Sequence, residues 1–287
     1  MLNSTNVRNT FLLLLLISTL SVKAGGGWTY SKGKGYFKLG ENIICADQSF
    51  GPNGKLTEKF ATISMYTTSI YGEYGITDKL TAILYLPFFV RSTINAIRYN
   101  QTGTEIEGDQ ANAFGDTNLS LKYGFFQDKA IVLGVSLTLG LPLGETAGGK
   151  GKILQSGDGE FNQLLRVDAS HSFHPVPLYA SLFAGYNNRT EGFSDEVHFG
   201  GEIGYTLSKF NFAFKIHSVN TTYNGSDNVF QIENSLFGNN VEYFSYTPEI
   251  AYTHKDRMGI AISAGYAASG KRILADPNYS IGIFLKL

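Results

Sequence analysis

The sequence of 287 residues is poor in cysteine, tryptophan and proline, with one, one and seven of them. A single cysteine excludes a disulfide framework and a metal site built from several thiolates. Basic and acidic residues number 23 and 24, so the basic excess typical of nucleic-acid-binding proteins is missing and no nucleic-acid partner is expected. No apolar run reaches the roughly 18 residues that a membrane-spanning helix requires. Hydrophobic residues nevertheless make up 43%, which excludes disorder as the main state.

Residues 1–24 have the features of a secretory signal peptide. Arg8 supplies the positive charge, and Phe11–Leu20 forms a mostly apolar stretch that is too short to anchor the chain in a bilayer. Val22-Lys23-Ala24 ends in a small residue suited to cleavage before Gly25. We therefore expect an exported protein whose mature chain, residues 25–287, forms one domain.

The mature chain alternates between apolar and small or polar residues with a period of two, as β-strands do. The clearest example is 130–144, where large aliphatic residues occupy one face and Gly, Ser and Thr occupy most of the other. The pattern predicts an all-β fold with about twelve strands. The predicted strands are residues 35–46, 60–76, 79–93, 114–126, 130–144, 160–173, 178–190, 195–208, 210–222, 240–254, 257–269 and 276–287.

The connections between these segments alternate between two classes. Short turns such as Thr77-Asp78 and Ser208-Lys209 are separated by mostly longer loops such as 94–113 and 145–159. An even number of antiparallel strands, with short turns at one end and long loops at the other, is typical of an outer-membrane barrel of Gram-negative bacteria. We expect a transmembrane antiparallel up-and-down β-barrel in contact with outer-membrane lipid and lipopolysaccharide, inserted by the barrel-assembly machinery.

A family resemblance rests mainly on residues 60–145. The stretch 114–123, FGDTNLSLKY, resembles a strand of the outer-membrane family named for the meta-pathway of phenol degradation, and Leu141-Pro142-Leu143-Gly144 is similar to the ending of its next long strand. The turn Tyr74–Leu80 and the following Leu86-Pro87 also resemble that family. The resemblance implies a transporter of aromatic or otherwise hydrophobic compounds. The chain departs from a common barrel ending, because Leu287 is last and Phe284 lies three residues earlier.

The interior of the barrel carries the functional prediction. By strand alternation, ten charged or titratable side chains are predicted to face the lumen: Lys38, Glu73, Asp116, Lys122, Arg166, Asp168, Glu202, Lys215, His217 and Glu249. Because an unpaired charge in a narrow lumen is costly, we expect these groups to pair or remain hydrated. They indicate either a polar conduit for small solutes or a network that only stiffens the barrel.

Three functions follow, in order of preference. The first is a barrel that passes small solutes passively, and the second is a closed structural or adhesive surface barrel. The third is an outer-membrane hydrolase, for which His198, with Asp195 and Glu196 beside it, is the only candidate base near the outer rim. No serine-hydrolase motif accompanies it, so no catalytic residue, enzyme activity, cofactor or metal is predicted.

Overall fold

The computed structural model describes residues 25–226, 229 and 237–287, with only the backbone of residues 58–60. The predicted signal peptide lies outside the described residues. The long strands are β1 (Gly35–Phe50), β2 (Leu56–Thr77), β3 (Leu80–Ile94), β7 (Thr117–Phe125), β8 (Ile131–Leu141), β9 (Asn162–Ser172), β10 (Leu178–Arg189), β11 (Glu196–Leu207), β12 (Phe210–Thr221), β13 (Glu242–His254), β14 (Met258–Lys271) and β16 (Asn278–Lys286). Among the described residues, no helix is long and apolar enough to cross a membrane.

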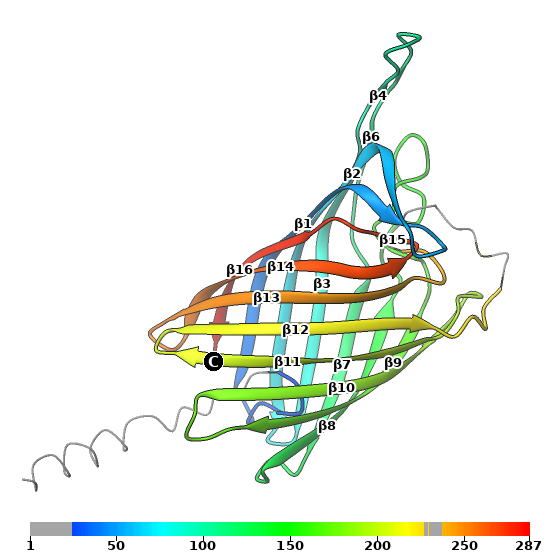
Figure 1. Ribbon diagram of the computed structural model, residues 1–287. Coiled ribbons are helices and arrows are strands. Elements are labelled where there is room, and N and C mark those ends of the chain that lie inside the picture. The colour runs from blue at the N-terminus through cyan, green and yellow to red at the C-terminus, as the bar shows by residue number, and fades with distance from the viewer. Residues whose placement is uncertain (1–24, 227–228, 230–236) are drawn as a thin grey trace, which may run out of the picture.

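These strands form a closed antiparallel barrel (Figure 1). Sequential long strands pair with each other, and β1 closes the sheet by pairing with β2 on one side and with β16 on the other, from Tyr36↔Lys286 to Ile44↔Asn278. Closure pairs the backbone N–H and C=O groups that would otherwise lie at open sheet edges. This matters in a membrane because lipid offers these groups no hydrogen bonds. Within the described residues the predicted twelve-stranded all-β barrel is confirmed.

The largest departure from the predicted strands lies in residues 94–113, for which the sequence predicts a loop. Asp109–Ala113 forms β6, which pairs with the end of β3, and Ile97–Arg98 (β4) pairs with Glu105–Ile106 (β5). Figure 1 shows that this hairpin projects beyond the barrel at the end that carries the long loops. Ile273–Leu274 (β15) similarly pairs with Ser49 and Phe50 at the end of β1.

The outer surface of the barrel is apolar and the inner surface is small or polar. On β8, Leu137 is 47% exposed, whereas its neighbour Ser136 is buried at 7% exposed. The exposed face continues around the barrel with Leu121, Leu165, Leu182, Ile203, Phe212, Ile250, Ile262 and Ile283. Such an exposed aliphatic belt is costly in water and favourable against lipid tails.

We expect Leu137→Arg to destabilise the barrel by about 2–4 kcal/mol, the cost of an arginine at the bilayer midplane. Unfolding titration with urea in lipid vesicles measures this loss. Leu143→Arg is the matched control, because Leu143 is similarly exposed but lies in the long loop after β8. Equal stability of both variants would contradict the assignment of the Leu137 face to lipid.

Candidate functional site

Residues 25–34 precede β1 and lie against the inner wall of the barrel at the end that carries the short turns. The backbone of this N-terminal segment is held by side chains of the wall. Ser170 on β9 accepts a hydrogen bond from Gly27 N at 2.9 Å, and Thr81 on β3 accepts one from Tyr30 N at 3.0 Å. Figure 1 shows the segment, in dark blue, within the barrel. The sequence patterns did not predict it.

Gln127, in the short turn between β7 and β8, is the main anchor of the N-terminal segment. Its Nε2 donates to Gly27 O at 2.9 Å, and its Oε1 accepts from Thr29 N at 3.1 Å. A side chain at Gly27 would place its Cβ 2.8 Å from Val132 O, so only glycine allows this close approach. The segment is therefore seated by specific polar contacts, with Thr29 only 2% exposed.

A buried ion pair lies beside the N-terminal segment. Lys122 Nζ on β7 is 3.2 Å from Glu73 Oε2 on β2, and both side chains are almost completely buried. Tyr71 OH donates to Glu73 Oε1 at 2.7 Å, and Lys122 Nζ also donates to Gly26 O at 3.3 Å. The Lys122 ammonium and the Glu73 carboxylate require such partners, because burying either charge alone would be strongly unfavourable.

A second cluster lies on β11, β12 and β13. Lys215 Nζ lies 3.1 Å from Glu249 Oε2 and 3.7 Å from Glu202 Oε2, and Tyr179 OH donates to Glu202. The Tyr179 ring also contacts Trp28 of the N-terminal segment edge to face, with 6.0 Å between centroids. Tyr179 therefore connects this cluster to the N-terminal segment.

Arg166 and Asp168 form an ion pair on a single strand, β9. Arg166 Nη2 is 2.5 Å from Asp168 Oδ1, and Arg166 Nε donates to both carboxylate oxygens at 3.1 Å. Asp168 is almost fully buried, whereas the Arg166 side chain is 33% exposed. The guanidinium also stacks over the Phe183 ring of β10, at 3.7 Å from its centroid.

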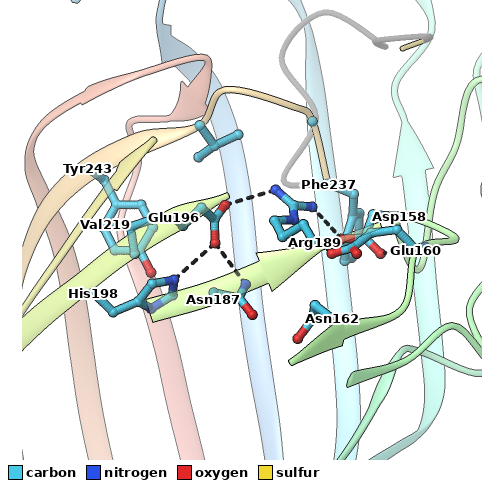
Figure 2. A pocket seen from close by; sticks show the side chains of 12 residues that line it. Asp158, Glu160, Asn162, Asn187, Arg189, Glu196, His198, Val219, Phe237 and Tyr243 are labelled. Carbon is cyan, nitrogen blue, oxygen red and sulfur yellow. Dashed lines mark hydrogen bonds and ion pairs between the residues drawn. The ribbon is translucent and has the colours of Figure 1, made fainter. Parts of the chain in front are cut away.

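The most highly connected cluster lies at the long-loop end and is centred on Arg189 (Figure 2). Arg189 binds three carboxylates through three different nitrogens: Asp158 at 2.8 Å, Glu160 at 2.7 Å and Glu196 at 2.8 Å. The guanidinium offers five N–H donors in a fixed plane, which suits several carboxylates at once. This Arg189 cluster joins the loop between β8 and β9 to the ends of β10 and β11.

The carboxylates of the Arg189 cluster lie close to further acidic groups. Asp116, between β6 and β7, accepts hydrogen bonds from Gly144 N and Asp158 N, each at 2.8 Å. Burial, with the neighbouring Asp116 carboxylate opposing the effect of Arg189, raises the pKa of Asp158 to about 6. The cluster therefore contains more acidic groups than its single guanidinium neutralises.

The structure places His198, the candidate base of a hydrolase, in a chain of interacting side chains. Its Nε2 lies 3.0 Å from Glu196 Oε2, and its Nδ1 lies 3.3 Å from His217 Nε2. His217 Nδ1 in turn lies 3.4 Å from Tyr243 OH. Asp195 instead accepts from Tyr186 OH. In the described part of the chain no serine or threonine hydroxyl is bonded to either imidazole, so the nucleophile–base arrangement of a hydrolase is not assembled there.

The ten predicted lumen residues fall into distinct environments. The structure pairs Glu73 with Lys122, Arg166 with Asp168, and Lys215 with Glu202 and Glu249. His217 joins the chain from Glu196, and Lys38 lies half-buried on β1. Asp116 lies outside the long strands and holds loop amides.

Sequence reasoning missed the central members of the Arg189 cluster. Arg189 and Glu196 lie within the predicted strands 178–190 and 195–208 and continue the inward alternation of β10 and β11, so applying that alternation as far as the strand ends would have identified them. Asp158 and Glu160 lie in a loop, where no periodicity indicates which way a side chain points.

No family model and no curated protein matches the chain. Several solved structures are similar to this chain. An outer membrane channel from Pseudomonas putida F1 superposes with a TM-score of 0.64 over 93% of this chain and 100% of that one, at 12% identity. The NanC porin superposes with a TM-score of 0.50 over 88% and 100%, at 11% identity. At such low identity the likeness concerns architecture, and the chain has the closed-barrel fold of outer-membrane channels.

Proposed function

We propose that the protein is exported, resides in the bacterial outer membrane and passes small solutes passively through its lumen. The observation that carries the proposal is the contrast between the two faces of the wall: an exposed aliphatic exterior and an interior lined by paired charges. The interior of a purely structural barrel can be filled with apolar side chains at lower cost. The names of the two similar structures, a channel and a porin, agree with this function.

The family resemblance of residues 60–145 narrows the solute class to aromatic or otherwise hydrophobic compounds. Aromatic side chains do lie along the inner wall, with Phe183 against Arg166 and Tyr243 against His217. Opposed charges beside aromatic rings suit small ring compounds that carry one polar group. The surrounding lipid, lipopolysaccharide and barrel-assembly machinery are the partners that the proposed location implies.

The refolded mature chain in a planar lipid bilayer tests the proposal. We expect steady ohmic current steps, with partial block when a small aromatic acid is added. Absence of current from protein whose folding is verified by circular dichroism would contradict passive passage. It would favour a closed structural or adhesive barrel, the second candidate, which the N-terminal segment against the inner wall specifically supports.

Arg166→Ala should shift the reversal potential of the channel toward cation selectivity in a salt gradient. The substitution removes a partly exposed positive charge while the partner Asp168 remains. Arg257→Ala, which removes an exposed arginine near the short turn between β13 and β14, is the control. Unchanged reversal potentials in both variants would leave Arg166 with a structural role only.

A further inference from the structure

A pocket of about 180 Å³ lies next to the Arg189 cluster at the long-loop end of the lumen. Its lining includes three carboxylates, of Asp158, Glu160 and Glu196, and the side chains of Val219, Val241 and Tyr243. Figure 2 shows Val219 and Tyr243 near Glu196, with Asp158 and Glu160 beyond Arg189. Sites for drug-sized ligands usually exceed about 300 Å³, so this pocket suits a smaller molecule. This mixture of charged and apolar side chains suits a molecule with one charged and one apolar end.

The charged groups that line the pocket carry a net negative charge at neutral pH. Three carboxylates face a single guanidinium, and Asp116 adds a fourth acidic group against Asp158. His198 contributes positive charge only when it is protonated. The field in the pocket therefore favours a cation and opposes an anion.

Asn187 supplies an observation that is independent of these charges. It lies on β10, is 6% exposed and lines the pocket, and its Nδ2 donates to Glu196 Oε2 at 3.1 Å. Its Oδ1 is buried without a hydrogen-bond partner. Exchanging the two amide atoms would place an oxygen against the Glu196 carboxylate, so the hydrogen bond determines the orientation. A buried acceptor left in this way calls for a donor from a ligand.

We propose that this pocket is a binding site for a small organic ammonium ion with an apolar body, a class for which benzylamine is a convenient probe. The ammonium N–H groups donate to Asn187 Oδ1 and to the pocket carboxylates, whose total negative charge exceeds the single positive charge of Arg189. The apolar body packs on Val219 and Val241, with the Tyr243 ring beside it. The proposal deepens the proposed function, because a solute that enters from the long-loop side meets this pocket early in the lumen.

An inorganic cation fits the pocket less well. Across residues 25–226, 229 and 237–287, no group of three or more His, Cys, Asp or Glu side chains is placed to hold a metal ion. The carboxylates converge on Arg189 instead, and the side chains of Val219 and Val241 offer a metal no ligand. An organic ammonium ion can contact both the charged and the apolar side chains.

Calorimetric titration of the folded protein in detergent tests the proposal without requiring any transport. We expect benzylamine to bind with one molecule per chain, and benzyl alcohol and benzoate, which have the same ring, to bind at least tenfold more weakly or not at all. Asn187→Val should weaken benzylamine binding by about tenfold, the usual effect of removing one hydrogen bond to a charged group. Asn188→Val is the matched control, because Asn188 is the next residue on β10 and is exposed. This variant should bind benzylamine with the affinity of the wild-type chain.

The outcomes separate this inference from the proposed function. Binding by a chain that conducts no current would support the site while contradicting passive passage. Equal affinity for benzylamine and benzyl alcohol, displacement of benzylamine by equimolar Mg²⁺, or an unchanged affinity of Asn187→Val would each overturn the ammonium site. If Asn187→Val does not fold, Asn187→Ala, with a smaller side chain at the same position, is expected to show the same loss of binding.

Discussion

Deletion of residues 25–31 should increase the single-channel conductance of the barrel by roughly twofold or more, because twelve strands enclose a lumen only moderately wider than the filled interior of an eight-stranded barrel. The deleted residues lie against the inner wall from β3 to β10, through contacts to Thr81, Lys122, Ser170 and Tyr179. Their removal leaves β1 intact, since that strand begins at Gly35. Planar-bilayer recording at fixed salt concentration measures the change.

A deletion of the same length, residues 98–104 of the β4–β5 hairpin, is the control, because this hairpin projects beyond the barrel (Figure 1). Gln127→Leu is a milder variant that removes the side-chain bonds to Gly27 and Thr29. We expect it to give a fluctuating conductance between those of the wild-type chain and the deletion variant. If the 25–31 deletion and the hairpin deletion have the same conductance as the wild-type chain, the N-terminal segment does not limit the pore.

The position of the N-terminal segment could not be predicted from the sequence, because it depends on contacts with residues far away in the chain. Barrel strands can be predicted from sequence because their residues alternate between the lipid-facing and the lumen-facing side of the wall. Gly25-Gly26-Gly27-Trp28 has no such period, and its position depends on distant partners, such as Ser170, that are 143 positions away from Gly27 in the sequence. The sequence could indicate only that about ten residues precede the first predicted strand.

Strand alternation predicts the face that a charged side chain occupies but not the partner that it binds. Inward alternation selected Glu73 and Lys122, on strands that are not neighbours in the sheet, because β3 lies between β2 and β7. The pattern says which face a side chain occupies, whereas pairing across a strand also depends on shear and side-chain length. Arg166 and Asp168, two residues apart on one strand, were the exception, because their proximity follows from strand geometry alone.

Strand alternation alone does not predict the Arg189 cluster. Two of the three carboxylates that bind Arg189 belong to residues 158 and 160, in the loop between β8 and β9, where the direction of a side chain is determined by turns and local hydrogen bonds. Asp158 N, for example, donates to Asp116, and Thr190 N donates to Glu160. These contacts connect three separate segments of the chain and exist only once the barrel has formed.

Replacement of Arg189 by methionine should therefore destabilise the barrel strongly, by about 3–5 kcal/mol at pH 8, the usual cost of leaving buried charges without their partner. Arg189 is the common partner of Asp158, Glu160 and Glu196, and its side chain is only 6% exposed. Arg257→Met, at an exposed arginine, is the control and should change stability by less than about 0.5 kcal/mol. Urea unfolding in lipid vesicles measures both variants.

The pH dependence of this loss identifies its electrostatic origin. The pKa of Asp158 is about 6 in the folded chain and 3.8 as the ordinary value, so protonation of this carboxyl favours the folded state. That stabilisation is complete below the ordinary pKa and is lost as pH rises through the folded pKa. Arg189 lowers the Asp158 pKa, so its removal raises that pKa further and extends protonation to higher pH.

Arg189→Met should consequently lose less stability at pH 5, where Asp158 takes up a proton, than at pH 8, where more of the carboxylate charge is left without a partner. Arg189→Lys should fall between the wild-type chain and Arg189→Met at pH 8, since an ammonium retains the charge but not the planar set of donors that reaches three carboxylates. An equal loss at both pH values would mean that Arg189 stabilises the barrel through packing, for example on Phe193, whose ring centroid lies 4.4 Å from its guanidinium carbon, rather than through its carboxylates.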